Sequence, residues 1–349
     1  MARRHATLVE VARHSGVSLA TASRVLNGSS RQVSQALRDR VLASARELGY
    51  VPNASAQALA RNSSTLFGLI VHDITDPYFS SIAAGVSRVT EQAGLVVVLG
   101  MTNREPDREL SLLATLRAHR ARAVVIAGSR TASETDIQRL TAEIDAFVDQ
   151  GGRVACISQP GLPADTVVPE NQPGAEALAT ALAEQGHRRF AVLAGPPDLL
   201  TASQRLAGFR TGLATAGIEL PDSAVVHGDF TREAGYQAAL ELIERRTGAT
   251  CVFAVNDVMA LGALGAFRER GLDVPGDVSL SGFGDIPPLR YITPALTTVR
   301  LPIEELGERA ALLALGEGTD TGTERQIVRI GAEVVLRAST AAPTGPGLA

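Results

Sequence analysis

Apolar residues in the first fifty positions recur at helical spacing. Leu8, Val11 and Ala12 fall on one face of a predicted helix. Gly16 can supply the left-handed turn that follows, and Ser18 can cap a second helix. The inner face of that second helix is formed by Ala22, Val25 and Leu26. Because Ala12 is small enough to let the second helix cross closely, the pattern predicts a helix-turn-helix.

A third helix is predicted to start at Ser34, its expected cap, and to end at Gly49. Its inward positions are Leu37, Val41, Leu42, Ala45 and Leu48. A further short helix is predicted within residues 53–63, with Asn53 as its cap, before a polar linker. So short a helix is marginal alone in water, and two interpretations stay open. It is either a plain tether or a wedge in which the exposed Leu59 enters between minor-groove base steps.

The chain from residue 64 to about 340 alternates short apolar runs with amphipathic stretches such as 80–93 and 259–270. Apolar runs of this length, separated by helices, are typical of buried strands in parallel sheets. The first series of predicted strands covers residues 66–71, 95–99, 123–127 and 153–157. The second series covers residues 189–194, 224–227, 251–255 and 278–281. The expected fold class is therefore α/β, with two doubly wound units whose strand ends face a ligand-binding crevice.

Composition argues against a membrane or secreted protein. The 349 residues are 45% hydrophobic, which is apolar enough for packed cores, and the chain is too long for one ordinary domain. No apolar run of about 18 residues exists, and Met1 leads into a charged amphipathic stretch rather than a signal core. Cys156 and Cys251 have no cysteine or histidine partners nearby, so we interpret both as buried thiols in a cytoplasmic protein.

Positive charge is concentrated in the head of the chain. Residues 1–61 carry nine arginines against three acidic residues, a net charge of +6, so the remainder carries −10 of the total of −4. A basic head on an acidic body favours a polyanion as partner of the head. The alternative is a solvated, arginine-rich helix surface, which would explain the same charge. The outward residues of the second helix are Leu19, Ala20, Thr21, Ser23 and Arg24. Their hydroxyls suit phosphates and the guanidinium suits a guanine edge, which favours double-stranded DNA.

The body carries no recognisable catalytic or cofactor motif. A P-loop is absent, and the pair Gly282 and Gly284 is followed by two prolines that cannot begin a dinucleotide-binding helix cleanly. Neither a nucleophile elbow nor a metalloprotease motif occurs, and the six histidines are scattered. We therefore expect no enzyme activity, no cofactor and no metal. A periplasmic solute-binding protein would explain the crevice, but it would need a signal peptide, which we do not find.

Motifs in the head resemble a known family. Residues 8–59 contain Val-Ser-Leu-Ala-Thr-Ala-Ser-Arg-Val-Leu-Asn-Gly, Leu-Gly-Tyr-Val-Pro-Asn and Ala-Gln-Ala-Leu-Ala, and they resemble the headpiece and hinge helix of the LacI/GalR family of bacterial transcription regulators. The resemblance implies a homodimer on a pseudo-palindromic operator, with paired hinge leucines, here Leu59, intercalating at a central step that is often CG. It also implies DNA contacts by Thr7, Ser18, Leu19, Ala20, Thr21, Ser23, Arg24, Asn27, Tyr50, Asn53 and Leu59. Ala22 departs from the family, which more often has valine there, and a repacked core could absorb the change.

The body resembles the effector domain of the same family, which is similar to periplasmic sugar-binding proteins. The matching motifs include Asp-Ile-Thr-Asp-Pro-Tyr-Phe from Asp73, Arg-Leu-Ala-Gly-Phe from Arg205 and Asn-Asp-Val-Met-Ala-Leu-Gly from Asn256. The resemblance implies a ligand pocket formed by Asp76, Tyr78, Phe79, Ser158, Thr201, Arg205, Phe230 and Asn256. It implies a repressor of carbohydrate or sugar-acid metabolism genes. A sugar, sugar acid or sugar phosphate in the cleft would switch it, with release of DNA as the default response.

Four of these pocket residues have a clear chemical reason and an alternative. Tyr78, Phe79 and Phe230 can stack on a sugar face, although each could belong to the core instead. Arg205 offers a fork of donors to hydroxyls or a carboxylate, or it could form an ion pair between the two subdomains.

The remaining polar positions leave the ligand's charge open. Asp76 and Asn256 can bond hydroxyls, or can cap the helices that follow their strands. Gly284 departs from the family, which commonly has aspartate there. Loss of a carboxylate beside Arg205 would make the pocket less hostile to anions, so we hypothesise a sugar acid or phosphorylated sugar as the ligand. The neighbouring Asp285 could take over the missing role.

These patterns give a domain plan. It consists of a headpiece at 1–52, a hinge at 53–63 and an effector-binding and dimerisation domain at 64–340. The first subdomain is expected to contain residues 64–160 and 290–322, and the second residues 161–289 and 323–340. Residues 341–349 are rich in proline and glycine without a heptad pattern. We therefore expect a disordered tail and a dimer without a coiled-coil tetramerisation element.

Overall fold

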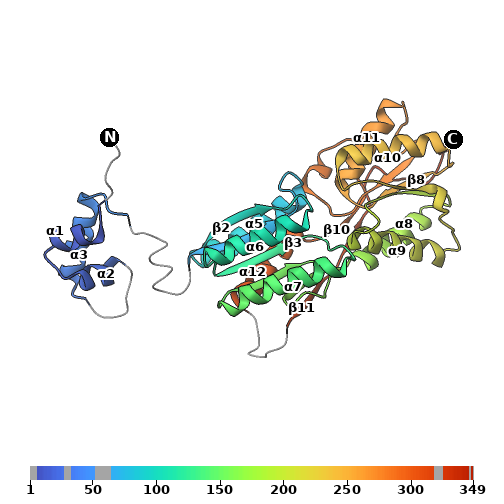
Figure 1. Cartoon of the computed structure of the whole chain (residues 1–349). Coiled ribbons are helices and arrows are strands. Elements are labelled where there is room, and N and C mark those ends of the chain that lie inside the picture. Colours follow the sequence, from blue (N-terminus) through green and yellow to red (C-terminus); the bar gives the residue numbers. More distant parts are fainter. Residues whose placement is uncertain (1–5, 27–32, 52–63, 318–324, 346, 349) are drawn as a thin grey trace. The chain divides into compact units, whose positions relative to one another are not determined.

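The computed structural model describes residues 6–26, 33–51, 64–317, 325–345 and 347–348 (Figure 1). The chain divides into two compact units, Met1–Thr65 and Leu66–Ala349. Among the described residues, three helices form the first unit, and parallel sheets with helices form the second. The predicted fold class is therefore confirmed. No helix among the described residues has the length and apolar character needed to span a bilayer.

The headpiece has the predicted helix-turn-helix. Its helices are α1 (Leu8–His14), α2 (Leu19–Leu26) and α3 (Gln35–Glu47). Thr7 caps α1 through a reciprocal capping box with Glu10, and the Ser18 side chain accepts the Thr21 N–H at 3.1 Å where α2 begins. The small core consists of Val11, Ala12, Ala22, Val25, Val41 and Ala45. Ala22 is fully buried there, so the core is packed around the smaller residue.

Two details of α3 differ from the prediction. Leu42 is 38% exposed, and Ser44 is buried in its place. The residues of α3 that face the core are Val41, Ser44 and Ala45, because positions three and four apart share a helix face and Leu42 lies about 100° away. Ser34 precedes the helix as expected, but its side chain makes no capping hydrogen bond.

The first half of the body is a six-stranded parallel sheet in the order β11-β5-β4-β3-β1-β2. Its strands are β1 (Leu66–Val71), β2 (Val96–Met101), β3 (Ala123–Ala127), β4 (Arg153–Ile157), β5 (Asp165–Pro169) and β11 (Ile327–Ile330). Its helices are α5 (Pro77–Gln92), α6 (Pro106–Ala118), α7 (Glu134–Asp149) and α12 (Ile303–Leu315). Alternate residues of β1 enter different cores: Ile70 packs with residues of α6 and α7, whereas Leu69 belongs to the core that contains residues of α5 and α12.

The second half is a four-stranded parallel sheet in the order β7-β6-β8-β9. Its strands are β6 (Phe190–Ala194), β7 (Val225–His227), β8 (Cys251–Ala254) and β9 (Ser279–Ser281). The helices are α8 (Asn171–Glu184), α9 (Leu200–Thr215), α10 (Arg232–Arg245) and α11 (Asp257–Glu269). Strands β10 (Thr298–Arg300) and β12 (Glu333–Val335) pair antiparallel as a small separate sheet. Short 3-10 helices lie at Asp222–Ala224 and Pro287–Arg290. Figure 1 shows the two halves side by side within the body.

The predicted subdomain boundaries need correction. The segments that form β5 and β11 were expected in the second subdomain and were not predicted to be strands, but both extend the sheet of the first half, and β11 pairs with β5 at its edge. The chain returns to the first sheet at β11 because the short run Ile327–Ile330 supplies one more parallel strand at an open edge. The run 95–99 was expected to be a buried strand. Instead β2 is the opposite edge strand, and it exposes Val96, Val98, Leu99 and Met101.

The prediction of a disordered tail is wrong for the described residues beyond 340. Leu348 is 2% exposed and packs into the core of the body. Its N–H donates to the Ala249 carbonyl at 2.9 Å, and its own carbonyl accepts the Gly248 N–H at 2.7 Å. The sequence did not reveal this anchor, because a single leucine and two backbone hydrogen bonds hold the segment. Neither leaves a pattern in a stretch rich in proline and glycine.

Candidate functional site

The exposed face of α2 carries most of the predicted DNA contacts of the headpiece. Leu19, Ala20 and Arg24 are exposed, with Leu19 at 50%. The hydroxyls of Ser18 and Thr21 lie 2.8 Å apart and form the cap of the helix, while both residues keep some exposure. This face therefore presents two apolar side chains and one guanidinium, which suits contacts to thymine methyl groups and a guanine edge.

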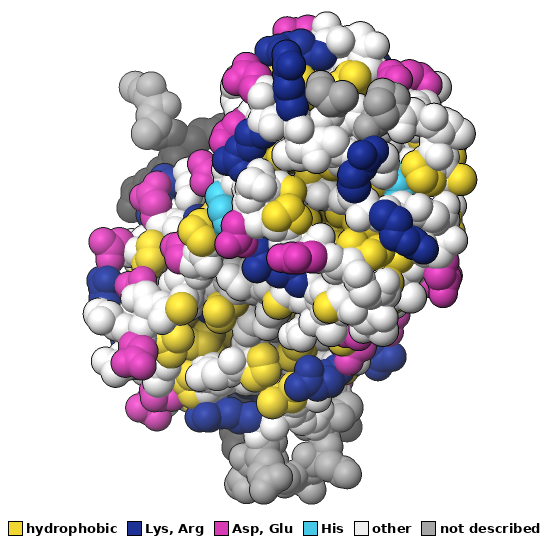
Figure 2. Space-filling view, turned by 90° about the vertical axis from the view of Figure 1, so that its right-hand side faces the viewer, with side chains coloured by type: hydrophobic (Ala, Val, Ile, Leu, Met, Phe, Trp, Pro, Cys, Tyr) yellow, Lys and Arg dark blue, Asp and Glu magenta, His cyan; other side chains and the backbone are white. Residues whose placement is uncertain are grey.

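The other predicted DNA contacts lie around this face or outside the described residues. Thr7 is exposed and caps α1, Ser23 is half-buried, and Tyr50 packs partly against the headpiece core. Asn27, Asn53 and Leu59 fall outside the described residues, as does the whole of the predicted hinge at 53–63. Basic and acidic side chains are interspersed on the face of the molecule shown in Figure 2, rather than gathered into one basic surface.

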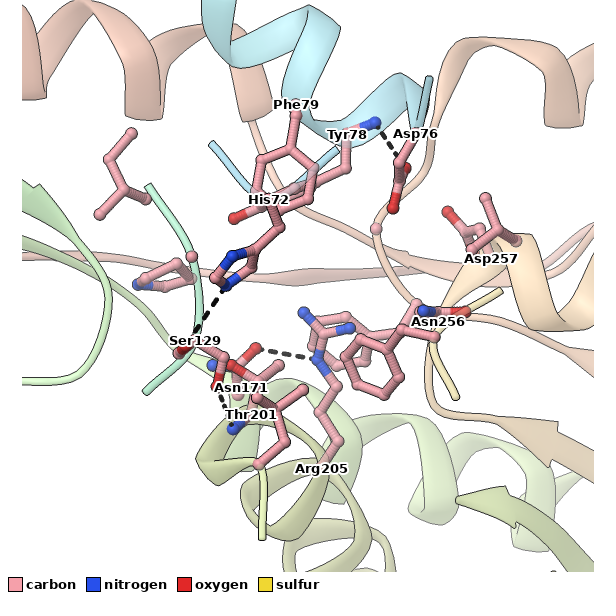
Figure 3. Close-up of a pocket in the computed structure, with 18 of the residues that line it drawn as sticks. His72, Asp76, Tyr78, Phe79, Ser129, Asn171, Thr201, Arg205, Asn256 and Asp257 are labelled. Carbon is pink, nitrogen blue, oxygen red and sulfur yellow. Dashed lines mark hydrogen bonds between the residues drawn. The ribbon is translucent and has the colours of Figure 1, made fainter. Parts of the chain in front are cut away.

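A second candidate site lies in the body, where both halves line a cavity (Figure 3). The first half contributes residues that follow β1, β3 and β4, and the second contributes residues that follow β8 and β9. The cavity thus lies at the carboxyl ends of parallel strands, where open α/β sheets bind ligands. It is lined by eight of the nine predicted ligand residues: Asp76, Tyr78, Phe79, Ser158, Thr201, Arg205, Phe230 and Asn256.

Arg205 is a buried charge that projects from the second half into the cavity. The residue is 6% exposed, and its guanidinium carbon lies 3.9 Å from the centre of the Phe283 ring. Its Nε donates to Asn171 Oδ1 at 2.9 Å and its Nη1 donates to the Val255 carbonyl at 2.7 Å. Burial lowers the pKa of Arg205 to about 10, so it stays charged at neutral pH. Among the ion pairs of the described residues, none involves Arg205, so the predicted alternative of an interdomain ion pair is not found.

Asp76 and Asn256 cap helices, as one of the two open alternatives predicted, and their contacts with a ligand stay a prediction. Asp76 Oδ1 caps α5 by accepting the Tyr78 N–H at 2.9 Å, and Asn256 Oδ1 caps α11 by accepting the Met259 N–H at 2.8 Å. Both residues also line the cavity. Each cap uses one oxygen, which leaves the second carboxylate oxygen of Asp76 and the amide nitrogen of Asn256 able to contact a ligand. Burial raises the pKa of Asp76 above its usual value.

The aromatic residues form an apolar wall of the cavity. Phe79 packs edge-to-face against Tyr78 and against His72, with ring centres 5.1 Å and 5.6 Å apart. Burial raises the pKa of Tyr78 to about 12, so its hydroxyl remains a hydrogen-bond donor at neutral pH. Phe230 comes from the other half and is only partly buried. The rings therefore contribute to both core and cavity, rather than to one of them as the two alternatives supposed.

Sequence reasoning missed several cavity residues, two of which connect the halves. Gln159, after β4, donates from Nε2 to Thr201 Oγ1 at 2.9 Å, and Ser129, after β3, accepts the Thr201 N–H at 2.9 Å. His72, after β1, bonds Thr102 Oγ1 at 2.8 Å. Burial, with smaller contributions from nearby arginines, lowers the pKa of His72 to about 3, so the imidazole is neutral. The available signal was position, because each follows the end of a predicted strand.

The structure corrects the role suggested for Asp285. Its carboxylate does not line the cavity, since it binds Arg300 Nε at 2.8 Å, Arg337 Nη2 at 2.6 Å and Arg290 Nη2 at 3.5 Å. Burial alone would raise the pKa of Asp285, but hydrogen bonds from Arg300 and Arg337 outweigh it and hold the pKa below its usual range. This ion cluster anchors the segment after β9 instead of contacting a ligand.

Gly284 itself has no carboxylate, but the carboxylate of Asp257 lies beside it. Gly284 has a φ of +136°, which disfavours any side chain, and a Cβ there would lie 3.0 Å from Asp257 Oδ2. The Asp257 carboxylate accepts the Ile286 N–H at 3.0 Å and the Thr298 hydroxyl at 2.7 Å. Burial raises its pKa to about 6. The reasoning from Gly284 to an anionic ligand therefore loses its premise.

This buried carboxylate gives a pH-dependent stability. Because the pKa of Asp257 is higher in the folded chain than its usual 3.8, its contribution is fully present below that value and is lost as pH rises through about 6. Asp257→Asn removes the titration, and the Thr298 hydroxyl can rotate to accept from the amide. We expect the melting temperature of the wild type, relative to this variant, to rise as pH falls from neutral toward 5 in thermal denaturation. A relative fall over that range would contradict the assignment.

A helix-turn-helix unit joined to a two-half body with a cleft is the architecture of a DNA-binding regulator controlled by a small molecule. The protein-family model "Bacterial regulatory proteins, lacI family" matches residues 7–53, and the family model "Periplasmic binding protein-like domain" matches residues 179–340. The transcriptional regulator GalR of Escherichia coli (strain K12) is 36% identical over 310 residues, covering 89% of this chain and 88% of GalR. The chain therefore belongs to the LacI family of bacterial regulatory proteins, and it is a transcriptional regulator rather than an enzyme.

Solved structures agree with this assignment. The Lac repressor dimer bound to operator and the anti-inducer ONPF has a TM-score of 0.83 and 28% identity, covering 97% of this chain and 100% of that one. The complex of the transcriptional regulator CelR with cellobiose has a TM-score of 0.70 and 31% identity, with coverage of 96% and 100%. Both the head and the body therefore have counterparts in regulators captured with DNA or a sugar.

Proposed function

We propose that this protein is a cytoplasmic repressor that binds a pseudo-palindromic operator as a homodimer and releases it when a small molecule enters the cleft. The effector is a sugar, sugar acid or sugar phosphate, and the regulated genes serve its metabolism. The observation that carries this proposal is the cleft itself, where polar groups from both halves converge in a chain that also has a helix-turn-helix. The Lac repressor and CelR complexes support both partners.

The contacts across the cleft supply the element that a ligand can bias. Thr201 of the second half is bonded to Gln159 and to Ser129 of the first, so the observed arrangement is held together along one wall. A ligand that prefers this arrangement, or a more open one, shifts the equilibrium between the two. A preference of about 1 to 3 kcal/mol is enough for a useful response.

The edge strand β2 supports a homodimer. It exposes Val96, Val98, Leu99 and Met101 at the end of the first sheet. An apolar edge strand in contact with water invites association, and a second copy of the chain would cover it. The DNA side of the proposal requires the same symmetry, because two recognition helices read the two half-sites of a palindrome.

The test is selection of bound sequences from a random pool of double-stranded DNA by the purified full-length protein. Enrichment of a palindrome with a central CG step is the expected result. The selection is then repeated with added sugars, sugar acids and sugar phosphates. The compound that is the effector should abolish the enrichment of the palindrome. If no sequence is enriched in any of these conditions, the proposed function is wrong.

Arg24 is expected to carry much of the direct base recognition. Leu19 and Ala20 can offer only apolar contacts, so the guanidinium is the principal hydrogen-bonding group on the exposed face of α2. Arg24→Ala should weaken binding to the selected operator by about 1 to 3 kcal/mol while leaving binding to random DNA nearly unchanged. Fluorescence anisotropy with both DNAs measures this, and Arg46→Ala on α3 is the matched control. An unchanged ratio of the two affinities would refute the role.

A further inference from the structure

We propose that a side cavity within the first half binds a second glycosyl unit of the effector. The side cavity is lined by residues that follow β1, β2 and β3 and by residues of α6 and α7. It adjoins the cleft between the halves, since four residues line both. Resting on the proposed role of the cleft as the effector site, this inference narrows the effector to a disaccharide or another glycoside with a second hydroxylated ring.

The side cavity lies at the carboxyl ends of three neighbouring strands. β1 lies between β2 and β3 in the sheet, so the chain adds β2 on one side of β1 and then β3 on the other. Such a reversal of strand order leaves a gap between the connecting segments, where ligands of open α/β sheets bind. His72 follows β1, Thr102 follows β2 and Ser129 follows β3, and all three line the side cavity. The first half therefore has a favourable binding position of its own, to which the second half adds only Leu199 among the described residues.

Four residues stand at the boundary between the cleft and the side cavity: His72, Arg104, Ser129 and Leu199. The His72 ring is fixed there, because its Nδ1 bonds Thr102 Oγ1 at 2.8 Å and the ring packs edge-to-face against Phe79 (Figure 3). Thr102 Oγ1 also accepts the Arg104 N–H at 3.1 Å, which favours donation of its own proton to His72. The neutral imidazole then carries its proton on Nε2, whose contact with the Ser129 carbonyl is long at 3.4 Å. A ligand that extends from one cavity to the other meets a fixed donor at this point.

The Arg104 side chain is the loosely held part of the boundary. Its Nε is buried without a hydrogen-bond partner among the described residues, and its guanidinium carbon lies 5.8 Å from the centre of the Phe230 ring. The carboxylates of Asp76, Asp229 and Asp73 act on its charge, but none of the ion pairs of the described residues involves it. Because these carboxylates already balance the charge, the guanidinium needs only a neutral acceptor. Its flexible stem lets it move aside and bond a hydroxyl of the ligand.

The charged groups of the side cavity favour a neutral ligand unit. Two arginines and three carboxylates line it, a net charge of −1: Arg104, Arg130, Glu105, Glu109 and Asp136. Glu109 neutralises Arg130 through two hydrogen bonds, yet the Nε of Arg130 is buried without a partner among the described residues. A hydroxyl oxygen can accept from this Nε without adding a charge. Other hydroxyls of the same ring can donate to the half-buried carboxylate of Asp136.

The apolar side of the side cavity suits the C–H face of a sugar ring. It is formed by Leu110 of α6, Ile137 and Leu140 of α7, and Leu199. Leu110 and Ile137 pack against the core of the first half but are only partly buried, so each still presents apolar surface. A few polar groups beside such a surface are the usual lining of a small-molecule site.

A ligand unit in the side cavity acts on the contact between the halves. Thr131 and Leu199 form an antiparallel backbone bridge, and the Leu200 N–H donates to the Arg130 carbonyl at 2.9 Å. Thr131, Arg130 and Leu199 also line the side cavity. The segment that closes this cavity is thus one through which the first half holds the second. The second unit of the effector therefore contributes to the switch as well as to affinity.

The first test compares disaccharides with their own monosaccharides by calorimetric titration of the full-length protein. The probes are cellobiose, lactose, melibiose, maltose and trehalose, together with glucose and galactose. At least one disaccharide should bind about tenfold or more tightly than either of its units, because its second ring gains contacts of its own. A series in which no disaccharide has this advantage overturns the proposal.

The second test fills the side cavity without changing the cleft. Ile137 lines the side cavity and not the cleft, so Ile137→Trp should remove the advantage of the disaccharide and leave monosaccharide affinity unchanged. Gln138→Trp, at the adjacent exposed position of α7, is the matched control. Asp136→Ala changes only the polar rim, and should lower the advantage whether or not the larger side chain is tolerated. Full retention of the advantage in a folded Ile137→Trp protein contradicts the assignment.

Operator selection separates this inference from the proposed function. A monosaccharide that abolishes enrichment of the palindrome, and that binds more tightly than every disaccharide, overturns the inference and leaves the proposed function intact. If no sequence is enriched under any condition, the proposed function itself is wrong.

Discussion

Arg205→Leu is expected to bind operator as the wild type does but to lose its response to the effector, with ligand affinity reduced about a hundredfold or more. The buried guanidinium is fixed by Asn171, the Val255 carbonyl and the Phe283 ring, so its remaining donors face the cavity in one orientation. Leucine replaces these donors with an apolar group and leaves the ligand's polar atoms unpaired. Calorimetric titration of the effector, together with operator release followed by anisotropy, measures both effects.

Two further substitutions make this result interpretable. Arg205→Lys keeps the charge but not the planar fork, so it should retain only part of the ligand affinity. Arg210→Leu lies on the same helix, where Arg210 forms an exposed ion pair with Asp222, and it should respond normally. Thermal denaturation checks that each variant is folded. A normal effector response in a folded Arg205→Leu protein would remove Arg205 from the site.

The strands that the sequence predicted best are those buried on both faces. The expected limits of β1, β3 and β4 agree with the structure, because central parallel strands are continuous apolar runs bounded by polar residues. Edge strands lack this signal. In the edge strand β11 half-buried and exposed positions alternate. The strand β5 lies inside the sheet, but it begins with an aspartate and ends with a proline. Their place in the first sheet depends on the return of the chain across the body, which no local pattern contains.

The candidate site divides in the same way. Family motifs predicted the cavity residues Asp76, Arg205 and Asn256, and the sequence also offered Asp76 and Asn256 as helix caps, which the structure confirms. The contact of the Arg205 guanidinium with the Phe283 ring needed coordinates. Asp285 was misplaced because its charge was visible in the sequence, but its pairing with Arg300 and Arg337, which come from later segments of the chain, was not. Arg104, which lines the cavity, was missed because its place on the wall depends on a turn with positive φ.

Glu109→Ala is expected to lower the free energy of unfolding of the body by about 3 to 5 kcal/mol, since removing one member of a buried ion pair strands the other. Glu109 binds Arg130 through two hydrogen bonds of 2.6 Å and 2.8 Å, and both side chains are 10% exposed. The Nε of Arg130 is already buried without a partner among the described residues. Denaturant unfolding followed by circular dichroism measures the loss.

The same pair is coupled to the cleft, which makes its substitution informative about function as well as stability. The backbone N–H of Arg130 donates to Gln159 Oε1 at 3.1 Å, and its carbonyl accepts the Leu200 N–H at 2.9 Å from the second half. A displaced Arg130 in Glu109→Ala would therefore disturb the wall that holds the halves together. We expect weaker effector binding in this variant even at temperatures where it remains folded.

A double substitution distinguishes a stranded charge from lost packing. Glu109→Leu combined with Arg130→Met replaces both members by apolar side chains of similar length, and most of the stability should return because no unpaired charge remains. Asp107→Ala, two residues earlier on α6, breaks an exposed ion pair with Arg139 and should change stability by less than about 1 kcal/mol. Equal losses in Glu109→Ala and the double variant would show that the cost comes from packing. Equal losses in Glu109→Ala and Asp107→Ala would show that the buried ion pair contributes no more to the free energy of unfolding than the exposed one.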